Sequence, residues 1–414
     1  MSPESLTTTD DANPRIAGID FVRGVAVLGI LAINITAFWG PTLASFSPAL
    51  PRPEAGAAPW FAAAYVLFEG KMRGLFTLLF GASMVLFADA AERRGENPDW
   101  VQARRLCWLA LFGYAHYLLL WWGDILFPYA VCGLMALVMA LALRRLEPAP
   151  LAAAALILFC VSHGLDAIGD IAGIAEEQRV LAGRGSPAEV AEQAAMMGRI
   201  AASIGADLRI LHAGFFDALH LRAATAPFLP FETTGVTFAE TFPLILLGMA
   251  AMRSGLFTGG WSLEALRRMA ITGIAAGGAL SLALISWSWT HQFPPRAMFA
   301  MMGSLAALPH LLMTVGYLAA LLLLWPHVAG SAAGQRLAAA GRCAFTNYIG
   351  TTILMTALFS GWGLGLGGTL PRGYLPLCLP LGWAAMLVWP QAWLTRFGIG
   401  PLEGIWRRLT WWKA

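Results

Sequence analysis

Two residues of this sequence, His116 and Asp124, have types and a spacing that could support proton transfer inside an apolar segment. A histidine beside a carboxylate can take a proton from an attacking group and return it to a leaving group. Ionisable side chains within a membrane span are costly, so they usually pair, line a cavity or do chemistry. We therefore consider His116 and Asp124 catalytic candidates, with a packed, hydrogen-bonded histidine as the alternative interpretation. An aspartate of the segment 149–171, Asp166 or Asp170, could orient His116 in place of Asp124.

Other polar residues should lie at a similar depth to His116. Glu69 and Arg73 are four residues apart at the start of one apolar segment, a spacing that allows an ion pair. His310 is a weaker candidate, because no carboxylate is near it in the sequence. The remaining members of this outer group are Asn34, Lys71, His163, Asp166 and Asp170.

A second group of charges should lie near the opposite membrane surface. Asp20 and Arg23 are three residues apart, which places them on one face of a helix. They form either an ion pair that stabilises packing or part of a binding site. Arginine guanidinium groups match phosphate geometry, so this group could hold a phosphate-bearing donor. Its other expected members are Arg104, Arg105, Arg342, Asn347, Glu403 and Arg407, although Arg104 and Arg105 could simply anchor a helix end in the positive-inside sense.

The amino-acid composition indicates the class of fold that must position these residues. Of the 414 residues, 58% are hydrophobic and only 12% are charged, whereas soluble domains carry about 25% charged residues. This deficit excludes a soluble globular protein, and the continuous apolar runs exclude the alternating strands of an outer-membrane barrel. The sequence therefore predicts an all-α, polytopic integral membrane protein in contact with a lipid bilayer. Its dispersed basic residues argue against nucleic-acid binding, and its five cysteines lack metal-ligand spacing.

About ten segments are long and apolar enough to span a bilayer. They cover residues 16–38, 72–91, 103–122, 125–143, 149–171, 236–256, 268–289, 298–325, 343–361 and 374–394. Arginine and lysine concentrate in alternate loops, which predicts that both termini are cytoplasmic.

This topology divides the chain into two membrane halves, residues 1–171 and 236–414, each with five spans. The intervening segment 172–235 is expected on the extracytoplasmic side. There, Ser186 and Glu189 form a capping-box pattern, which predicts a helix from this point to about residue 203 and a second helix near residues 207–222.

Six short motifs, in order along nearly the whole chain, make this sequence resemble the YeiB-like family of bacterial inner-membrane proteins, whose C-terminal portion is known as domain of unknown function 418. The motifs are Gly18–Gly24 (GIDFVRG), Lys71–Phe76 (KMRGLF), Gly123–Leu126 (GDIL), Leu246–Met249 (LLGM), Gly341–Tyr348 (GRCAFTNY) and Gly400–Glu403 (GPLE). The resemblance implies a multi-pass protein of the bacterial inner membrane.

The first-span pattern of an acidic residue, Arg23-Gly24 and Asn34 is also similar to that of transmembrane acyltransferases. This similarity implies that an acyl group moves from a cytoplasmic thioester, such as acyl-coenzyme A, to a small-molecule or glycan acceptor beyond the bilayer. Asp20, Arg23, Asn34, Lys71, Arg73, Arg104, Arg105, Arg342 and Asn347 would then bind the two substrates, and His116 would be the general base. A transporter and a non-catalytic scaffold are the alternatives, and the assembly state, a homodimer included, stays open.

Overall fold

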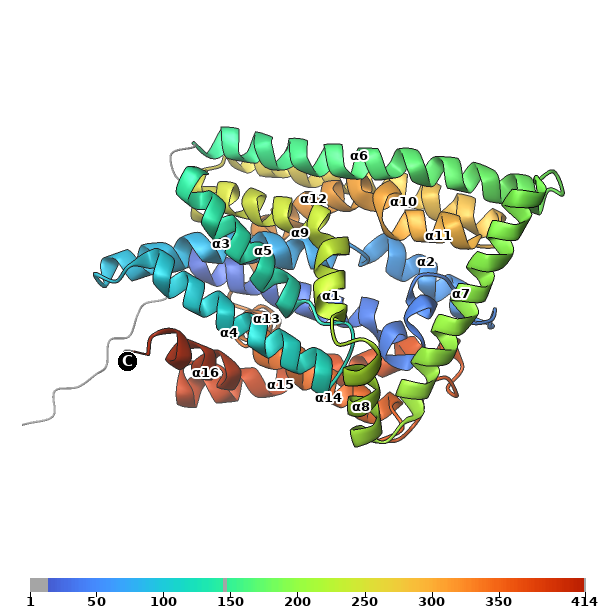
Figure 1. Cartoon of the computed structure of the whole chain (residues 1–414). Helices are drawn as coiled ribbons and strands as arrows, with labels where there is room; N and C mark the ends of the chain where they lie inside the picture. The colour runs from blue at the N-terminus through green and yellow to red at the C-terminus, as the bar shows by residue number, and fades with distance from the viewer. Residues whose placement is uncertain (1–13, 144–146, 413–414) are drawn as a thin grey trace, which may run out of the picture.

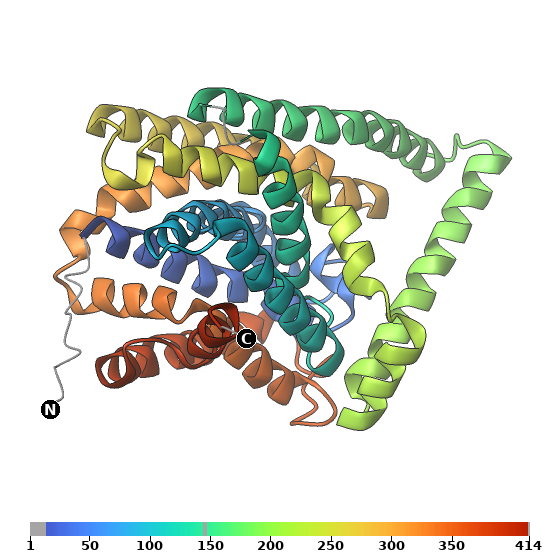
Figure 2. The same ribbon diagram turned by 60° about the vertical axis from the view of Figure 1, so that its left-hand side comes forward.

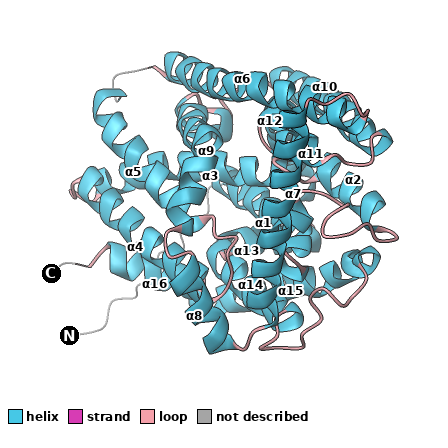
Figure 3. Cartoon of the chain, turned by 45° about the vertical axis from the view of Figure 1, so that its right-hand side comes forward, coloured by secondary structure: helices cyan, strands magenta, loops and turns pink. Residues whose placement is uncertain are grey.

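The computed structural model describes residues 14–143 and 147–412 of the chain. Within these ranges the protein consists of helices and connecting loops, without strands (Figure 3). Seven of the helical segments in these ranges are long and apolar enough to cross a membrane. The protein is therefore an all-α, polytopic membrane protein, as the composition predicts.

The helices follow one another along the described chain in the order that the labels of Figure 1 show. They are α1 (Pro14–Trp39), η1 (Thr42–Ser45), α2 (Ala57–Leu67), α3 (Lys71–Arg93), α4 (Pro98–Leu119), α5 (Leu126–Leu143), α6 (Pro148–Leu181), α7 (Pro187–His212), α8 (Phe215–Thr225), α9 (Leu229–Arg253), η2 (Leu256–Thr258), α10 (Leu263–Thr290), α11 (Pro295–Met302), α12 (Ser304–Val328), α13 (Ala332–Arg342), α14 (Ala344–Phe359), η3 (Arg372–Cys378), α15 (Leu379–Phe397) and α16 (Pro401–Thr410).

Each of the ten predicted spans overlaps at least one described helix. Seven overlap α1, α3, α6, α9, α10, α12 and α15, which belong to the long apolar segments. Two others correspond to shorter apolar stretches, Leu126–Met139 of α5 and Ala344–Phe359 of α14. The tenth is α4, whose 22 residues include several polar side chains.

Two breaks interrupt the helices of the bundle at glycine residues. The predicted span 298–325 is divided at Gly303 into α11 and α12, so the expected continuous helix is wrong at this point. A second break, at Gly70, separates α3 from α2, a helix that the hydropathy pattern did not predict. Gly70 has φ +72°, a left-handed conformation that glycine adopts without a steric penalty.

Between the two predicted membrane halves, α6 and α7 are longer than predicted, whereas α8 is shorter. The fifth span continues beyond residue 171 to Leu181, giving α6 34 residues, about 51 Å at about 1.5 Å per residue. The next helix, α7, ends at His212 instead of near residue 203, and α8 begins at Phe215 instead of near 207. The predicted boundaries followed the loss of hydrophobic periodicity, but polar residues do not end a helix unless a breaker follows. Figure 1 shows α7 crossing one end of the bundle.

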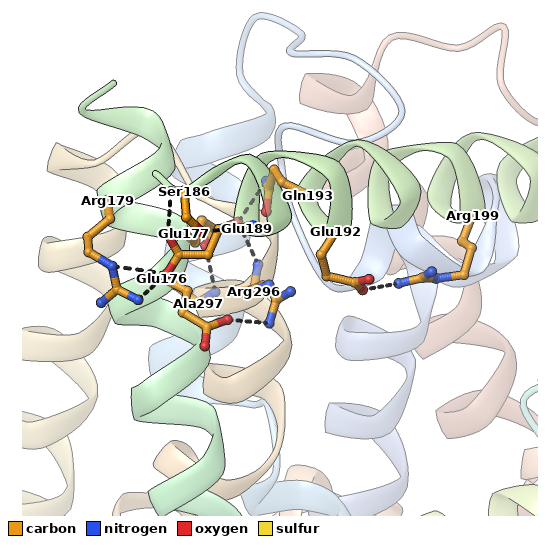
Figure 4. Close-up of polar contacts among 10 residues, drawn as sticks. All are labelled: Glu176, Glu177, Arg179, Ser186, Glu189, Glu192, Gln193, Arg199, Arg296 and Ala297. Atoms are coloured by element: carbon orange, nitrogen blue, oxygen red, sulfur yellow. Dashed lines mark hydrogen bonds and ion pairs between the residues drawn. The ribbon is translucent and has the colours of Figure 1, made fainter. Parts of the chain in front are cut away.

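The corner between α6 and α7 is fixed by polar contacts (Figure 4). Ser186 and Glu189 form the expected capping box. The buried carboxylate of Glu177 accepts the backbone N–H of Arg296, at 3.1 Å, at the start of α11. A hydrogen bond from the Arg179 guanidinium lowers the pKa of Glu189 to about 2. Because this pKa is below its ordinary value, the ionised Glu189 stabilises the folded state. This contribution to folding stability is fully present above about pH 4.5 and is lost as the pH falls towards 2.

Glycines allow α1 to lie very close to α13. A Cβ atom on Gly24 would be 1.9 Å from the carbonyl oxygen of Leu337, and one on Gly341 would be 1.8 Å from that of Asp20. Small residues let membrane helices pack backbone against backbone. This contact brings Arg23 on α1 close to Arg342 at the end of α13.

The orientation of the bundle stays a prediction, and the fold offers a direct test. The α3–α4 turn and α16 lie at one end of the bundle, and α7 lies at the other (Figures 1 and 2). Reporter proteins fused after Gly95 and after Gly185 should therefore report opposite compartments, with Gly95 on the cytoplasmic side. Identical signals from the two fusions would contradict the topology. Below, "inner" and "outer" refer to this predicted orientation.

Candidate functional site: two cavities along α3

The inner cavity has a volume of about 390 Å³ and lies between α1, α3, α4, α5, α13, α14 and α16. Its walls are mainly apolar, with Phe76, Leu79 and Phe80 of α3 facing Phe345 and Trp406. Its charged lining residues are three arginines and one carboxylate, namely Arg23, Arg105, Arg342 and Glu403. The cavity therefore combines cationic groups with a long apolar wall.

The three arginines differ in how they are held. Arg23 donates to Asp20 at 2.8 Å, which confirms the predicted pair. Arg342 donates to the carbonyl of Gly398 at 2.7 Å. The Arg105 guanidinium lies 4.6 Å from the Trp406 ring and has no carboxylate within ion-pair distance among the described residues. Arg105 is therefore available to an anionic group in the cavity.

The carboxylate of the inner cavity, Glu403, already accepts hydrogen bonds from the protein backbone. Glu403 accepts the backbone N–H groups of Phe345 at 2.8 Å and Thr346 at 3.0 Å, at the beginning of α14. A carboxylate at this position stabilises the positive end of the helix dipole. The positive charge of the inner cavity thus stays available to a ligand.

Two residues expected in this group have structural contacts instead. Arg104 donates to the carbonyl oxygens of Thr410 and Trp412 and lines neither cavity described here. Asn347 is buried, donating to the carbonyls of Ala340 and Met386, each at 3.2 Å. These partners are 7 to 308 residues away in sequence, so residue type and depth alone could not identify them.

The predicted partnership of His116 and Asp124 occurs in the structure, in a closed network. His116 Nδ1 is 2.9 Å from Asp124 Oδ1, and Nε2 is 3.1 Å from the Thr352 hydroxyl of α14. His116 and Asp124 are 3% and 4% exposed. Asp124 also accepts the backbone N–H of Phe127 at 2.7 Å. The network therefore ties the α4–α5 turn to α14.

His116 is one layer removed from the inner cavity. Its ring lies 5.0 Å from that of Tyr348, which lines the outer end of the cavity, and His116 itself lines neither cavity. Because both ring nitrogens already have partners, His116 could act as a base only after losing its contact with Thr352. Its catalytic role stays a prediction.

The outer cavity has a volume of about 560 Å³ and lies between α3, α6, α9 and α12. It gathers several residues of the expected outer group, together with others that the sequence did not indicate. The polar lining residues are Arg73, His163, Asp166, Asp170, Thr237, Glu240, Ser304, His310 and Thr314. Both helix breaks, Gly70 and Gly303, also line it. Irregular backbone at membrane depth is tolerated where it borders such a cavity.

His310 has an unusual position in this cavity. It is 5% exposed, and its Nε2 has no hydrogen-bond partner. The ring packs against Gly70, where a Cβ atom would be 2.0 Å from Nδ1. Buried polar atoms are rarely left unpaired, so an orphaned nitrogen on a cavity wall indicates a missing ligand or a chemical role.

Arg73 of α3 forms the ion pair with Glu69 that their spacing allows, but its shorter contacts are with another helix. Arg73 makes two hydrogen bonds to Glu240 of α9, at 2.7 and 3.3 Å, and a longer contact of 3.9 Å to Glu69. Lys71 is fully buried and donates to the carbonyl of Tyr65 at 2.7 Å. Asn34 is half-buried on α1 and lines neither cavity. Of the expected outer substrate-binding residues, Arg73 alone faces the outer cavity.

The two cavities approach each other along α3. Arg73 borders the outer cavity and Phe76 the inner one, a separation of about 4.5 Å along the helix axis. Between them, the hydroxyls of Thr77 and Tyr129 are 2.8 Å apart, and both donate to the carbonyl of Arg73. We call Arg73, Thr77 and Tyr129 the septum.

Two residues of the outer site, Glu240 and Ser304, were not indicated by the sequence, which gave His310 only as a weaker candidate. Glu240 is an acidic residue inside a predicted span, so the rule for intramembrane charges would have indicated it. Ser304 carried no such signal, and His310 was rated low because its carboxylate neighbours lie on α6 and α9, far away in sequence. Among the described residues, no group of histidines, cysteines and carboxylates has an arrangement that could hold a metal ion.

Comparison with known proteins agrees with the motifs. The chain is 29% identical over 402 residues to "Uncharacterized protein YeiB" of Escherichia coli, covering 96% of both chains. It is 28% identical to "Uncharacterized protein YxaH" of Bacillus subtilis, covering 96% of this chain and 94% of the relative. No solved structure matches significantly. Residues 251–413 match the family described as "Protein of unknown function (DUF418)". The chain is thus similar along its length to the two YeiB-like relatives, and its C-terminal part matches the DUF418 family model.

Proposed function

We propose that this protein is an acyltransferase of the bacterial cytoplasmic membrane. It would pass an acyl group from a cytoplasmic thioester, of the acyl-coenzyme A type, to an acceptor in the outer half of the bilayer. The observation that carries this proposal is the opposite charge of two cavities separated by one thin septum.

The charged residues that line the two cavities have opposite net charge. The inner cavity has three arginines and one carboxylate, whereas the outer cavity has one arginine and three carboxylates, Asp166, Asp170 and Glu240. A single solute passing through both would meet opposite electrostatic preferences. Two different molecules that exchange a group at the septum fit this arrangement better.

The inner cavity suits a thioester with a phosphate-bearing end. Arg105, with Arg23 and Arg342, can bind phosphate oxygens by charge-assisted hydrogen bonds. The lining residues of α3 extend from Phe76 to Ala90, about 21 Å at about 1.5 Å per residue. This length and its apolar wall can accommodate an extended arm that carries the acyl group towards the septum.

The chemical step would take place at the septum. An amino or hydroxyl group of the acceptor attacks the thioester carbonyl carbon, a C–N or C–O bond forms and the C–S bond breaks. The proton released by the acceptor passes to a histidine and from there to the departing thiolate. His310 suits this role better than His116, since its Nε2 is unpaired on the wall of the outer cavity.

A transporter is the second candidate, favoured by one observation. Both broken helices, α2–α3 and α11–α12, place their breaks on the outer cavity. Discontinuous helices commonly form substrate sites in secondary transporters. In this alternative the septum would be a gate, and Arg73 with Glu240 part of the pathway.

The two functions can be separated in proteoliposomes that contain the purified protein and a bacterial lipid extract. Acetyl-coenzyme A with an isotopically labelled acetyl group is supplied on the side of the inner cavity, and the lipid and solute fractions are analysed by mass spectrometry. We expect a labelled acetyl adduct with the native protein and none in protein-free liposomes. Movement of an unmodified solute without any acetylated product would contradict the proposal and support transport.

A further inference from the structure

The outer cavity is covered on the side that faces the outer aqueous phase. Phe46, after η1, lines the cavity, and its ring contacts that of Phe299 on α11 edge-on, at 6.1 Å between centroids. Met302 and Gly303, where α11 ends, complete this side of the lining. We call the segment of residues 42–50, with Phe299, the roof.

The roof is held rigidly. The buried guanidinium of Arg372 donates to the carbonyls of Ala44, Pro48 and Leu50, at distances between 2.7 and 3.1 Å. From α7, the Asp207 carboxylate accepts the backbone N–H of Thr42 at 2.8 Å. The side chains of Met196 and Ile200 on α7 also pack against Leu50. A segment fixed by so many contacts is a poor entrance for a substrate.

The side of the cavity between α6 and α9 is different. Leu165 on α6 and Val236 on α9 both line the cavity, yet they are 66% and 84% exposed. A Cβ atom on the lining residue Gly169 would meet no atom within 4 Å. Exposed apolar residues at the edge of a polar cavity indicate an opening towards the bilayer. We call the region of Leu165, Gly169 and Val236 the lateral mouth.

The depth of the lateral mouth matches the head-group region of a leaflet. Leu165 lies 17 residues after Pro148, about 26 Å from the inner end of α6. The hydrocarbon core of a bilayer is about 30 Å thick. The opening therefore lies close to the level at which outer-leaflet lipids change from acyl chain to head group.

The charges inside the mouth select the kind of head group. The cavity lining contains three carboxylates, Asp166 and Asp170 on α6 and Glu240 on α9. It contains a single guanidinium, that of Arg73. Arg73 is already paired with Glu240, so the remaining carboxylates favour a cation and disfavour a free anion. The unpaired Nε2 of His310 can accept a hydrogen bond from an amine.

From this arrangement we infer that the outer cavity takes up an amino-bearing lipid from the bilayer through the lateral mouth. The ammonium group would lie among Asp166, Asp170 and His310, and the acyl chains would stay in the membrane beside Leu165 and Val236. The inference deepens the proposed function by naming this lipid as the acyl acceptor, and only this assignment rests on the proposed function. Lipid entry itself needs no donor and can be tested alone.

The test uses the full-length protein in nanodiscs that contain phosphatidylethanolamine with a photoactivatable group in its acyl chain, and no thioester. After illumination, labelled peptides are identified by mass spectrometry. We expect labelling of α6 and α9 around the lateral mouth, with a several-fold preference over phosphatidylglycerol that carries the same photoactivatable group. Val236→Trp should reduce this labelling several-fold by filling the opening. Asp166→Asn combined with Asp170→Asn should remove the preference for the amino lipid.

Ile271→Trp is the matched control, because Ile271 is 68% exposed on α10 and lies outside both cavities. It should leave the labelling unchanged. Equal labelling of Val236→Trp and the native protein would overturn the lateral route, and equal labelling by phosphatidylglycerol would overturn the head-group assignment. Specific lipid labelling without acyl transfer in the proteoliposome assay would instead contradict the proposed function and leave lipid entry intact.

Discussion

Replacing His310 by glutamine is expected to abolish acyl transfer while leaving donor binding in the inner cavity unchanged. Glutamine preserves a hydrogen-bonding amide against Gly70 but cannot carry a proton between acceptor and thiolate. Loss of a general base lowers a rate by about 10²- to 10⁴-fold. The measurement is the rate of labelled product formation in proteoliposomes, with binding of acetyl-coenzyme A measured in parallel by calorimetry.

His116→Gln is the comparison that decides between the two histidines. His116 bonds to both Asp124 and Thr352, so its replacement should lower the thermal stability of the protein. The fraction that remains folded should retain most of its activity if His310 is the base. A folded and inactive His116→Gln protein, together with an active His310→Gln protein, would show that the buried network catalyses the reaction.

Donor binding should depend on Arg105 more than on its neighbour in sequence. Arg105 lines the inner cavity without a carboxylate partner among the described residues, so Arg105→Gln removes a phosphate contact and leaves no buried anion unpaired. A hydrogen bond to a charged group contributes about 1.5–3 kcal/mol, which corresponds to a loss of about 10- to 150-fold in affinity for acetyl-coenzyme A. Calorimetric titration measures this change directly.

Arg104→Gln is the matched control, because Arg104 has the same residue type and adjacent position but contacts the carbonyls of Thr410 and Trp412. It should leave donor affinity within about twofold and affect mainly the attachment of α16. The double variant Asp20→Asn, Arg23→Gln avoids an unpaired charge and should fold but bind donor weakly. Equal donor affinity in the Arg105→Gln and Arg104→Gln proteins would contradict the donor site.

The sequence by itself determined the class of the fold and the contacts made over short distances. A low charge content and about ten long apolar runs leave only helices, because a backbone in hydrocarbon must satisfy its own hydrogen bonds. The partners in Asp20–Arg23, His116–Asp124 and Ser186–Glu189 are eight residues or fewer apart, so helix and turn geometry was enough to place each among the candidate pairs. The motifs along the chain likewise indicated the similarity to the YeiB-like proteins.

Only the tertiary structure decided which charged groups share a cavity. Arg73 and Glu240 are 167 residues apart, and Arg372 lies more than 320 residues from the carbonyls that it binds. The breaks at Gly70 and Gly303 were equally hidden, since hydropathy averaged over about 20 residues does not register one glycine. His310 acquired carboxylate neighbours because α6, α9 and α12 pack around it. Packing between helices distant in sequence depends on the fit of all their side chains together, and no local pattern contains that information.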